Sequence, residues 1–156
     1  MIERIIYKDE VVSFLDSWKS GVVSIGQTYT ENNDFVSVAK DFISKHYNFT
    51  EGEVLFKPTF TKEVIFRNNK EDALSYFVKG NISEDNGFAI KPWEKIDLLD
   101  INIIIENGYC FCMGVLELFP LSKDESTKVA FTFMLVKDTN DSLKICLLYT
   151  SDAADE

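Results

Sequence analysis

The spacing of apolar residues in this chain changes at Glu53, from the period of a helix to the alternation of a strand. Before Glu53, helical spacing runs from Asp9 to a stop at Gly26, and again after Asn32-Asn33-Asp34. After Glu53, alternation predicts strands at 53–57, 60–67, 73–79, 96–105, 109–119, 128–137 and 142–149. Helices followed by strands joined as hairpins predict an α+β fold, in which a curved sheet folds over the helices and leaves a pocket between them.

The chain has 156 residues, a length that fits one domain, and no linker or repeat divides it. We expect residues 1–148 to form this domain and residues 149–156 to be a tail. The last ten residues, LLYTSDAADE, resemble the read-through of a sequencing adapter, and we favour this origin over an ordinary polar tail. On that interpretation the natural C-terminus is missing.

A net charge of -10 argues against nucleic acids and anionic membrane surfaces as partners, because both repel an acidic protein. No apolar run approaches the length of a membrane span, and the charged N-terminus does not resemble a signal peptide. Cys110, Cys112 and Cys146 are too few and too irregular for a disulfide framework. We therefore expect a cytoplasmic protein. His46 is the single histidine, so we predict no metal site and no cofactor.

Four residues are candidates for contacts with a ligand. Lys57 and Arg67 each end an apolar strand pattern, where a cation beside a cavity holds a carboxylate or phosphate. The alternative for both is a solvated strand-end charge or a salt bridge. Tyr76 lies in the same central stretch, from Glu53 to Gly80. Trp93 ends EDNGFAIKPW, a predicted loop that either closes over a ligand or plugs the open end of the fold.

Two further residues are candidates for acid–base catalysis. His46 falls on the apolar face of the second predicted helix, where it serves either as a general base or as a hydrogen-bonded residue of the core. Glu117 interrupts an apolar strand. If its face of the strand points into the pocket, burial would raise the pKa of this carboxyl and suit it to proton transfer. If that face points outward, Glu117 is an ordinary surface residue.

Several segments are similar to a small cytosolic group of the nuclear transport factor two-like (SnoaL-like) superfamily. This group is often labelled hypothetical or phosphoribosyl-AMP cyclohydrolase-like. The segments include WKSGVVSIG at 18–26, VLFKPT at 54–59, ALSYFVKGN at 73–81 and EDNGFAIKPW at 84–93. The resemblance implies a cone-shaped α+β domain that dimerises through its sheet. The superfamily includes isomerases, dehydratases and the association domain of a protein kinase, so the fold alone selects no activity. The cyclohydrolase label is not supported, because that enzyme needs metal-binding Cys and His residues.

The chain departs from this group near its end. In the group, the strand after the segment LKI ends in paired histidines and serines. Here LKI at 143–145 is followed by Cys146-Leu147-Leu148-Tyr149-Thr150-Ser151. Any function that uses those histidines is therefore absent from this sequence.

From these observations we expect a homodimer that binds a small, partly apolar molecule in its central pocket, through Lys57, Arg67, Tyr76 and Trp93. One alternative is an isomerase or dehydratase that uses Glu117 or His46 as its base. Another is a scaffold whose sheet supports oligomerisation. The motifs of the commonest hydrolases, nucleotide-binding proteins and metalloproteases are absent from the sequence.

Overall fold

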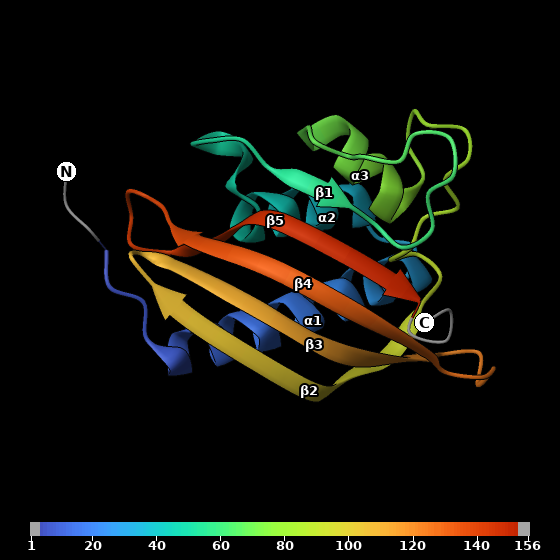
Figure 1. Ribbon diagram of the computed structural model, residues 1–156. Coiled ribbons are helices and arrows are strands. Elements are labelled where there is room, and N and C mark those ends of the chain that lie inside the picture. Colours follow the sequence, from blue (N-terminus) through green and yellow to red (C-terminus); the bar gives the residue numbers. More distant parts are fainter. Residues whose placement is uncertain (1–3, 153–156) are drawn as a thin grey trace.

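A computed structural model describes residues 4–152 as helices packed on one face of a five-stranded sheet (Figure 1). The helical elements are α1 (Lys8–Thr30), α2 (Phe35–His46), the short 3₁₀ helix η1 (Asn48–Thr50) and α3 (Lys70–Val78). The strands are β1 (Leu55–Lys57), β2 (Trp93–Glu106), β3 (Tyr109–Pro120), β4 (Thr127–Lys137) and β5 (Leu143–Asp152). This arrangement confirms the predicted α+β class and is consistent with a cone-shaped fold.

The strands lie in the order β1-β5-β4-β3-β2. Strands β2 to β5 pair antiparallel with their sequence neighbours, and β1 joins the edge of the sheet parallel to β5. Irregularities in register within the β2–β3 and β4–β5 pairs bend the sheet. Figure 1 shows α1 passing behind the sheet, with α2 and α3 behind and above β5.

The core lies between α1 and the inner face of the sheet. Alternation along β3 turns Cys110, Cys112, Leu116 and Leu118 inward, where all four are buried. On α1, the buried face follows helical spacing, as the sequence predicts. It consists of Val11, Phe14, Leu15, Trp18, Val22, Ile25 and Gly26. No helix in residues 4–152 is both long and apolar enough to span a bilayer.

Two predicted strands in the central stretch are wrong. Residues 60–67 form an irregular loop, and residues 73–79 fall largely within α3. The helix begins because the Asn69 side chain accepts a hydrogen bond from the Asp72 N–H at 2.9 Å. Ala73, Tyr76 and Phe77 are then buried at spacings of three and four residues, which place them on one face of a helix.

The predicted stop of the first helix at Gly26 is also wrong, because α1 continues to Thr30. A Cβ atom at Gly26 would lie 2.7 Å from the carbonyl oxygen of Ala89. Glycine at this position therefore permits close approach of two backbones, and it does not end the helix.

The other predicted strands agree with the structure to within a few residues. Strand β5, however, extends three residues beyond its predicted end, and Ser151 pairs with Ala130 of β4. Residues 149–152 of the predicted tail thus continue the sheet. Residues 153–156 lie outside the described part of the chain.

Candidate functional site

A cavity lies where the segments 58–68 and 79–92 meet the ends of β2 and β5. Its outer part has a volume of about 630 Å³ and an aromatic and polar lining that includes Phe60, Lys62 and Lys91. Its inner end is much smaller, about 20 Å³, which is space for about one molecule the size of water. Thr59, Tyr76 and Phe88 line both parts.

The inner end has predominantly apolar walls. The helices contribute Trp18 and Phe77, and the sheet closes the other side. The sheet residues that line it are Phe56, Leu116, Leu118, Val129, Phe133, Leu148 and Thr150. A space of this size and lining suits a very small molecule with both apolar and polar character.

Tyr76 brings a hydroxyl group to the apolar walls. Its ring is buried and stacks on Phe88, with centroids 5.6 Å apart. Burial raises the pKa of Tyr76, and the nearby backbone of Phe60 and Thr59 opposes this shift. The Tyr76 hydroxyl therefore stays protonated at neutral pH and remains able to donate a hydrogen bond.

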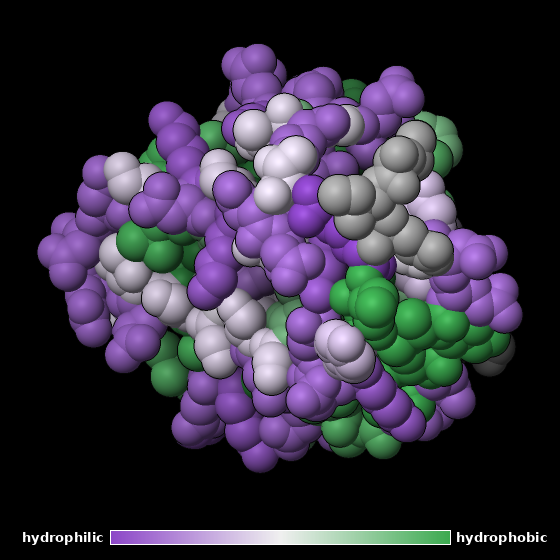
Figure 2. Space-filling view, turned by 90° about the vertical axis from the view of Figure 1, so that its left-hand side faces the viewer, coloured by the Kyte–Doolittle hydropathy of each residue, from purple (hydrophilic) through white to green (hydrophobic). Residues whose placement is uncertain are grey.

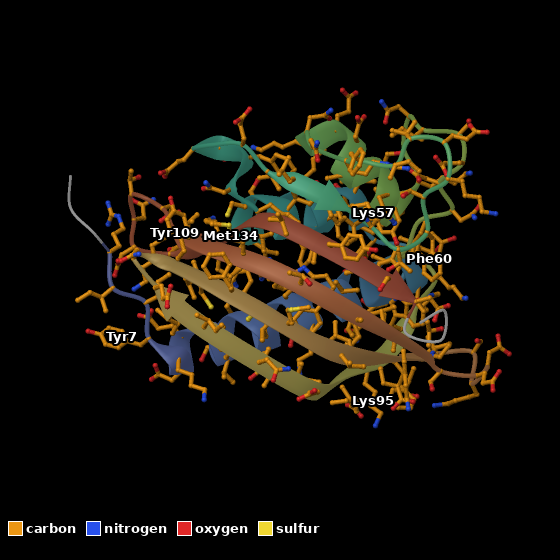
Figure 3. The ribbon with its side chains drawn as sticks, viewed as in Figure 1. Tyr7, Lys57, Phe60, Lys95, Tyr109 and Met134 are labelled. Atoms are coloured by element: carbon orange, nitrogen blue, oxygen red, sulfur yellow. The ribbon has the colours of Figure 1, made fainter. Side chains whose placement is uncertain are left out.

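Two threonine hydroxyls lie beside this group at the inner end. Thr59 Oγ1 donates a hydrogen bond to Thr150 Oγ1 at 2.7 Å, which ties the segment after β1 to the end of β5. Figure 3 shows the neighbouring Phe60 at the same end of the molecule, next to the end of β5. Thr59, Tyr76 and Thr150 are thus three hydroxyl-bearing residues that line one small, mostly apolar space.

Arg67, predicted to contact a ligand, is fully buried and paired with a carboxylate instead. Its guanidinium donates two hydrogen bonds to Asp85, at 2.6 and 2.8 Å. The salt-bridge alternative therefore describes Arg67 correctly, although the pair lies in the interior and not at a solvated strand end. Asp85 itself lines the outer cavity.

The other predicted ligand contacts divide between the cavity and the surface. Trp93 lines the outer cavity, and its Nε1–H donates to the Phe88 carbonyl at 2.9 Å. Lys57 does not line the cavity. Its Nζ donates to the Pro58 carbonyl at 2.9 Å and lies 5.5 Å from the centre of the Tyr149 ring.

Neither predicted acid–base residue lies at this cavity. Glu117 is on the outer face of β3, where it accepts a hydrogen bond from Ser126 at 2.6 Å. His46 is buried between α1 and α2. Its Nδ1–H donates to the Phe42 carbonyl at 2.8 Å, and its Nε2 accepts from Ser17 at 2.9 Å. Burial lowers the pKa of His46 to about 4, so it is neutral at pH 7.

Sequence reasoning missed Thr59, Phe88 and Thr150. Pro58 was the available signal for Thr59, because proline marks the point where a strand ends and a loop begins. Phe88 lies within the predicted loop EDNGFAIKPW, and Thr150 lies within the predicted tail. Residues 4–152 contain no group of three or more His, Cys, Asp or Glu side chains that could hold a metal ion.

Comparison with known proteins identifies the family of this chain, and one similar structure contains a bound small molecule. The family model described as "Metal-independent carbonic anhydrase" matches residues 9–152. A curated protein of the same description from Nostoc sp. (strain PCC 7120) is 29% identical over 156 residues, which cover 97% of this chain and 76% of that protein. The crystal structure of a cyanobacterial iota-carbonic anhydrase complexed with bicarbonate is 29% identical with a TM-score of 0.90. That match covers 97% of this chain and 94% of the other.

More distant structures share the fold alone. An NTF2-like protein from Novosphingobium aromaticivorans has a TM-score of 0.64 at 8% identity, over 96% of this chain and 83% of that chain. An NTF-2 like protein from Shewanella oneidensis MR-1 has a TM-score of 0.55 at 15% identity, over 92% and 98%. These similarities confirm the fold that the resemblance to this superfamily implies.

Proposed function

We propose that this chain, which belongs to the metal-independent carbonic anhydrase family, catalyses the reversible hydration of carbon dioxide to bicarbonate. The observation that carries the proposal is the grouping of Thr59, Tyr76 and Thr150 at a cavity end of about 20 Å³. The similar cyanobacterial structure, which is complexed with bicarbonate, supports a small ligand of this kind. Because bicarbonate is larger than one water molecule, we place it where the inner end opens into the outer cavity, at Thr59, Tyr76 and Phe88.

This family membership corrects the function expected from the sequence. We had predicted the binding of a partly apolar molecule without established catalysis, with an isomerase, a dehydratase or a scaffold as alternatives. The match over residues 9–152 is to a family defined by an enzymatic activity, and that activity is none of these.

The site offers separate features for each form of the substrate. Apolar walls such as Phe77 and Leu116 accommodate carbon dioxide, which carries no charge. Hydroxyl groups serve bicarbonate, whose three oxygen atoms need hydrogen-bond donors when they leave water. Protonated Tyr76 supplies one such donor inside the apolar walls, where an electrostatic contact is stronger than in water.

In the hydration direction, a water oxygen forms a bond to the carbon of carbon dioxide and loses one proton. Thr59 and Thr150 oxygens accept hydrogen bonds from this water and orient it. The Tyr76 O–H donates to the carbon dioxide oxygen on which negative charge develops, as in an oxyanion hole. The released proton passes through the outer cavity to solvent water.

The end of β5 limits how fast this site can work. The inner end is lined by no histidine or carboxylate among the described residues, so the proton must leave through the outer cavity. The resemblance described above implies paired histidines in this strand, whereas this chain has Leu148 facing the cavity. A histidine at this position would place a base two residues before Thr150 on the same strand face.

Oxygen-isotope exchange between carbon dioxide and water, followed in the presence of a chelator, tests the proposal. We expect the purified chain to exceed the uncatalysed rate. Tyr76→Phe should lose about tenfold to a hundredfold of that excess, because it removes the proposed donor to the developing charge. Tyr149→Phe makes the same change on the exposed side of β5 and should leave the rate unchanged.

The variant Leu148→His adds a base at the inner end of the cavity, and we expect it to raise the rate of isotope exchange. Leu147→His, on the other face of β5, is its control. If the wild-type chain and the folded Leu148→His variant both exchange at the uncatalysed rate, the proposed activity is wrong.

We also propose that the chain forms a homodimer through the outer face of its sheet. An apolar row crosses all five strands in register: Ile104, Phe111, Met134, Leu147 and Leu55. Ile104 and Phe111 are 60% and 44% exposed, and Figure 2 shows an apolar patch on the side of the molecule that the sheet forms. An apolar surface of this kind favours contact with a second copy.

A cytoplasmic location is part of the proposal. It is supported by Cys110, Cys112 and Cys146, which are free thiols in the structure, since a reducing compartment keeps thiols unpaired.

A further inference from the structure

A buried polar cluster lies beside the outer cavity, which its member Asp85 lines, and takes no part in the chemistry described above. It consists of Arg67, Asp85 and Ser75. The Arg67 side chain is 0% exposed and donates to both Asp85 carboxylate oxygens. Ser75 Oγ donates to Asp85 Oδ2 at 2.7 Å. All three side chains therefore meet at one carboxylate.

The rest of the Arg67 guanidinium is also satisfied. Its Nε donates to the Val64 carbonyl at 2.9 Å, and its Nη1 donates to the Asp72 carbonyl at 3.3 Å. Ser75 Oγ in turn accepts hydrogen bonds from the backbone N–H groups of Gly80 and Ile82. The cluster is thus joined to the backbone on several sides and has little freedom to move.

Each member of the cluster comes from a different segment, and each segment also carries one residue shared by both parts of the cavity. Segment 58–68 carries Arg67 and Thr59, and segment 79–92 carries Asp85 and Phe88. On α3, Ser75 immediately precedes Tyr76. The cluster therefore fixes the relative positions of the segments that form the site.

A contribution to stability does not by itself account for this cluster. Replacing a buried ion pair by apolar residues of similar size is often neutral or stabilising for the folded state. The reason is that the free energy of removing two charges from water offsets much of their electrostatic attraction. A bidentate Arg–carboxylate pair, by contrast, fixes distance and orientation more strictly than apolar contacts do. Orientation is what a site made of three uncharged hydroxyls requires.

We propose that Arg67 and Asp85 are positioning residues, which hold Thr59, Tyr76 and Phe88 in the geometry that the reaction needs. This proposal rests on the carbonic anhydrase activity proposed above. One contact links the pair to the site directly, because the Arg67 guanidinium lies 5.8 Å from the centre of the Tyr76 ring. The Phe88 N–H, from the segment that carries Asp85, also donates to the Tyr76 carbonyl at 2.9 Å.

The decisive variant is Arg67→Met/Asp85→Leu, which removes both charges of the pair together. Glu84 loses its 3.8 Å ion pair with Arg67 but keeps its three hydrogen bonds from backbone N–H groups of segment 58–68. We expect it to fold, with kcat reduced about tenfold to a hundredfold and KM changed less than about threefold. The matched control is Lys137→Met/Glu10→Leu, which removes an ion pair of 2.9 Å between β4 and α1. It should keep the wild-type kcat.

Amide hydrogen exchange supplies a readout that does not depend on activity. The N–H groups of Phe88 and Ala89 bond to the carbonyls of Tyr76 and Phe77, both at 2.9 Å. In the double variant these two amides should exchange faster while amides in β3 and β4 are unchanged. If the double variant does not fold, Arg67→Lys takes its place, because it keeps the charge but loses the bidentate geometry.

The outcomes separate the two proposals. A folded double variant with wild-type kcat and unchanged exchange at Phe88 and Ala89 overturns the positioning role. If the wild-type chain has no hydration activity, the proposed function fails, and the exchange rates still decide whether the pair positions these segments. Reduced kcat together with faster exchange supports both proposals.

Discussion

His46 shows how its surroundings determine what a single titratable group is able to do. Its Nδ1–H is held by the Phe42 carbonyl, so Nε2 is the free acceptor and takes the Ser17 hydroxyl. Burial, which opposes the charged form, lowers the pKa of His46 to about 4, and the cations of Lys45 and Lys144 add to this effect. At neutral pH this histidine is therefore uncharged, with its one ring proton on Nδ1, and it does not line the cavity proposed for catalysis.

The same shift predicts a dependence of stability on pH. Between pH 6.5 and about 4 the unfolded chain binds a proton at His46 that the folded chain does not. The folded state should therefore lose up to about 3 kcal/mol from this group as the pH falls through that range, and none above pH 6.5. Urea unfolding at several pH values measures the loss.

His46→Gln is the control for this prediction. His46 is the only histidine, so the other groups that titrate in this range are carboxylates. They are the same in both proteins and change the free energy of unfolding of each by almost the same amount. The free energy of unfolding of the variant should fall less steeply between pH 6.5 and 4. Parallel curves for the two proteins would show that His46 is not held in its neutral form.

For individual residues, the sequence predicted which side chains suit a binding or catalytic site better than it predicted where those side chains point. Tyr76 and Trp93 were expected at the pocket and do line it. Glu117 has the right chemistry for a base, but the register of β3 turns it to the outer face. That direction depends on which face of the strand meets α1, a fact of tertiary packing which alternation along one strand does not contain.

Among the elements, α3 was mistaken for a strand because nine residues give few helical turns to detect. The stretch ALSYFVK contains apolar residues at spacings of two as well as three and four. Asn69 favours the helix over a strand, because its side chain accepts a hydrogen bond from the Asp72 N–H at the start of the helix. The signal was in the sequence, but the expected alternation of strands obscured it.

This cap gives a prediction for the element. Asn69→Ala should destabilise the protein by about 1 kcal/mol, because it leaves an N–H of the first turn of α3 without its partner. Asn69→Ser keeps an accepting oxygen without placing a second carboxylate beside Asp72, and it should cost much less. Thermal unfolding of both variants measures the difference. Equal destabilisation would mean that the Asn69 side chain acts through some contact other than the cap.

The segment 58–68 has no strand or helix, and its order comes from distant residues. Glu84 accepts hydrogen bonds from the backbone N–H groups of Lys62, Glu63 and Val64, at 2.7 to 2.9 Å. Arg67 adds the buried pair with Asp85. Long-range contacts of this kind leave no local pattern, which is why the sequence predicted a strand here and missed Thr59 as a site residue.

For the molecule as a whole, the sequence predicted the architecture because its signals repeat along the chain. Alternation in the long strands and the Asn107-Gly108 turn each favour the same sheet of hairpins. The activity was not predictable in the same way. It depends on hydroxyl groups from segments far apart in sequence, and threonine and tyrosine carry no motif that marks them as a site.

The outer face of the sheet gives a prediction for the whole molecule. Phe111 lies near the start of β3, between Ile104 of β2 and Met134 of β4 in the apolar row. Met134 and Tyr109 are seen on this face of the sheet in Figure 3. A lysine at position 111 would place a charge in a contact between two copies, where desolvation is costly and the symmetric copy brings a second like charge nearby.

We therefore expect the wild-type chain to sediment as a dimer and Phe111→Lys to sediment as a monomer at the same concentration. Val12→Lys is the matched control, because Val12 is 40% exposed on α1, away from the sheet, and its replacement adds the same charge. It should remain dimeric. Sedimentation velocity distinguishes the species, and circular dichroism checks that each variant is folded. A wild-type monomer, or a dimer that survives Phe111→Lys unchanged, would show that this face does not join two copies.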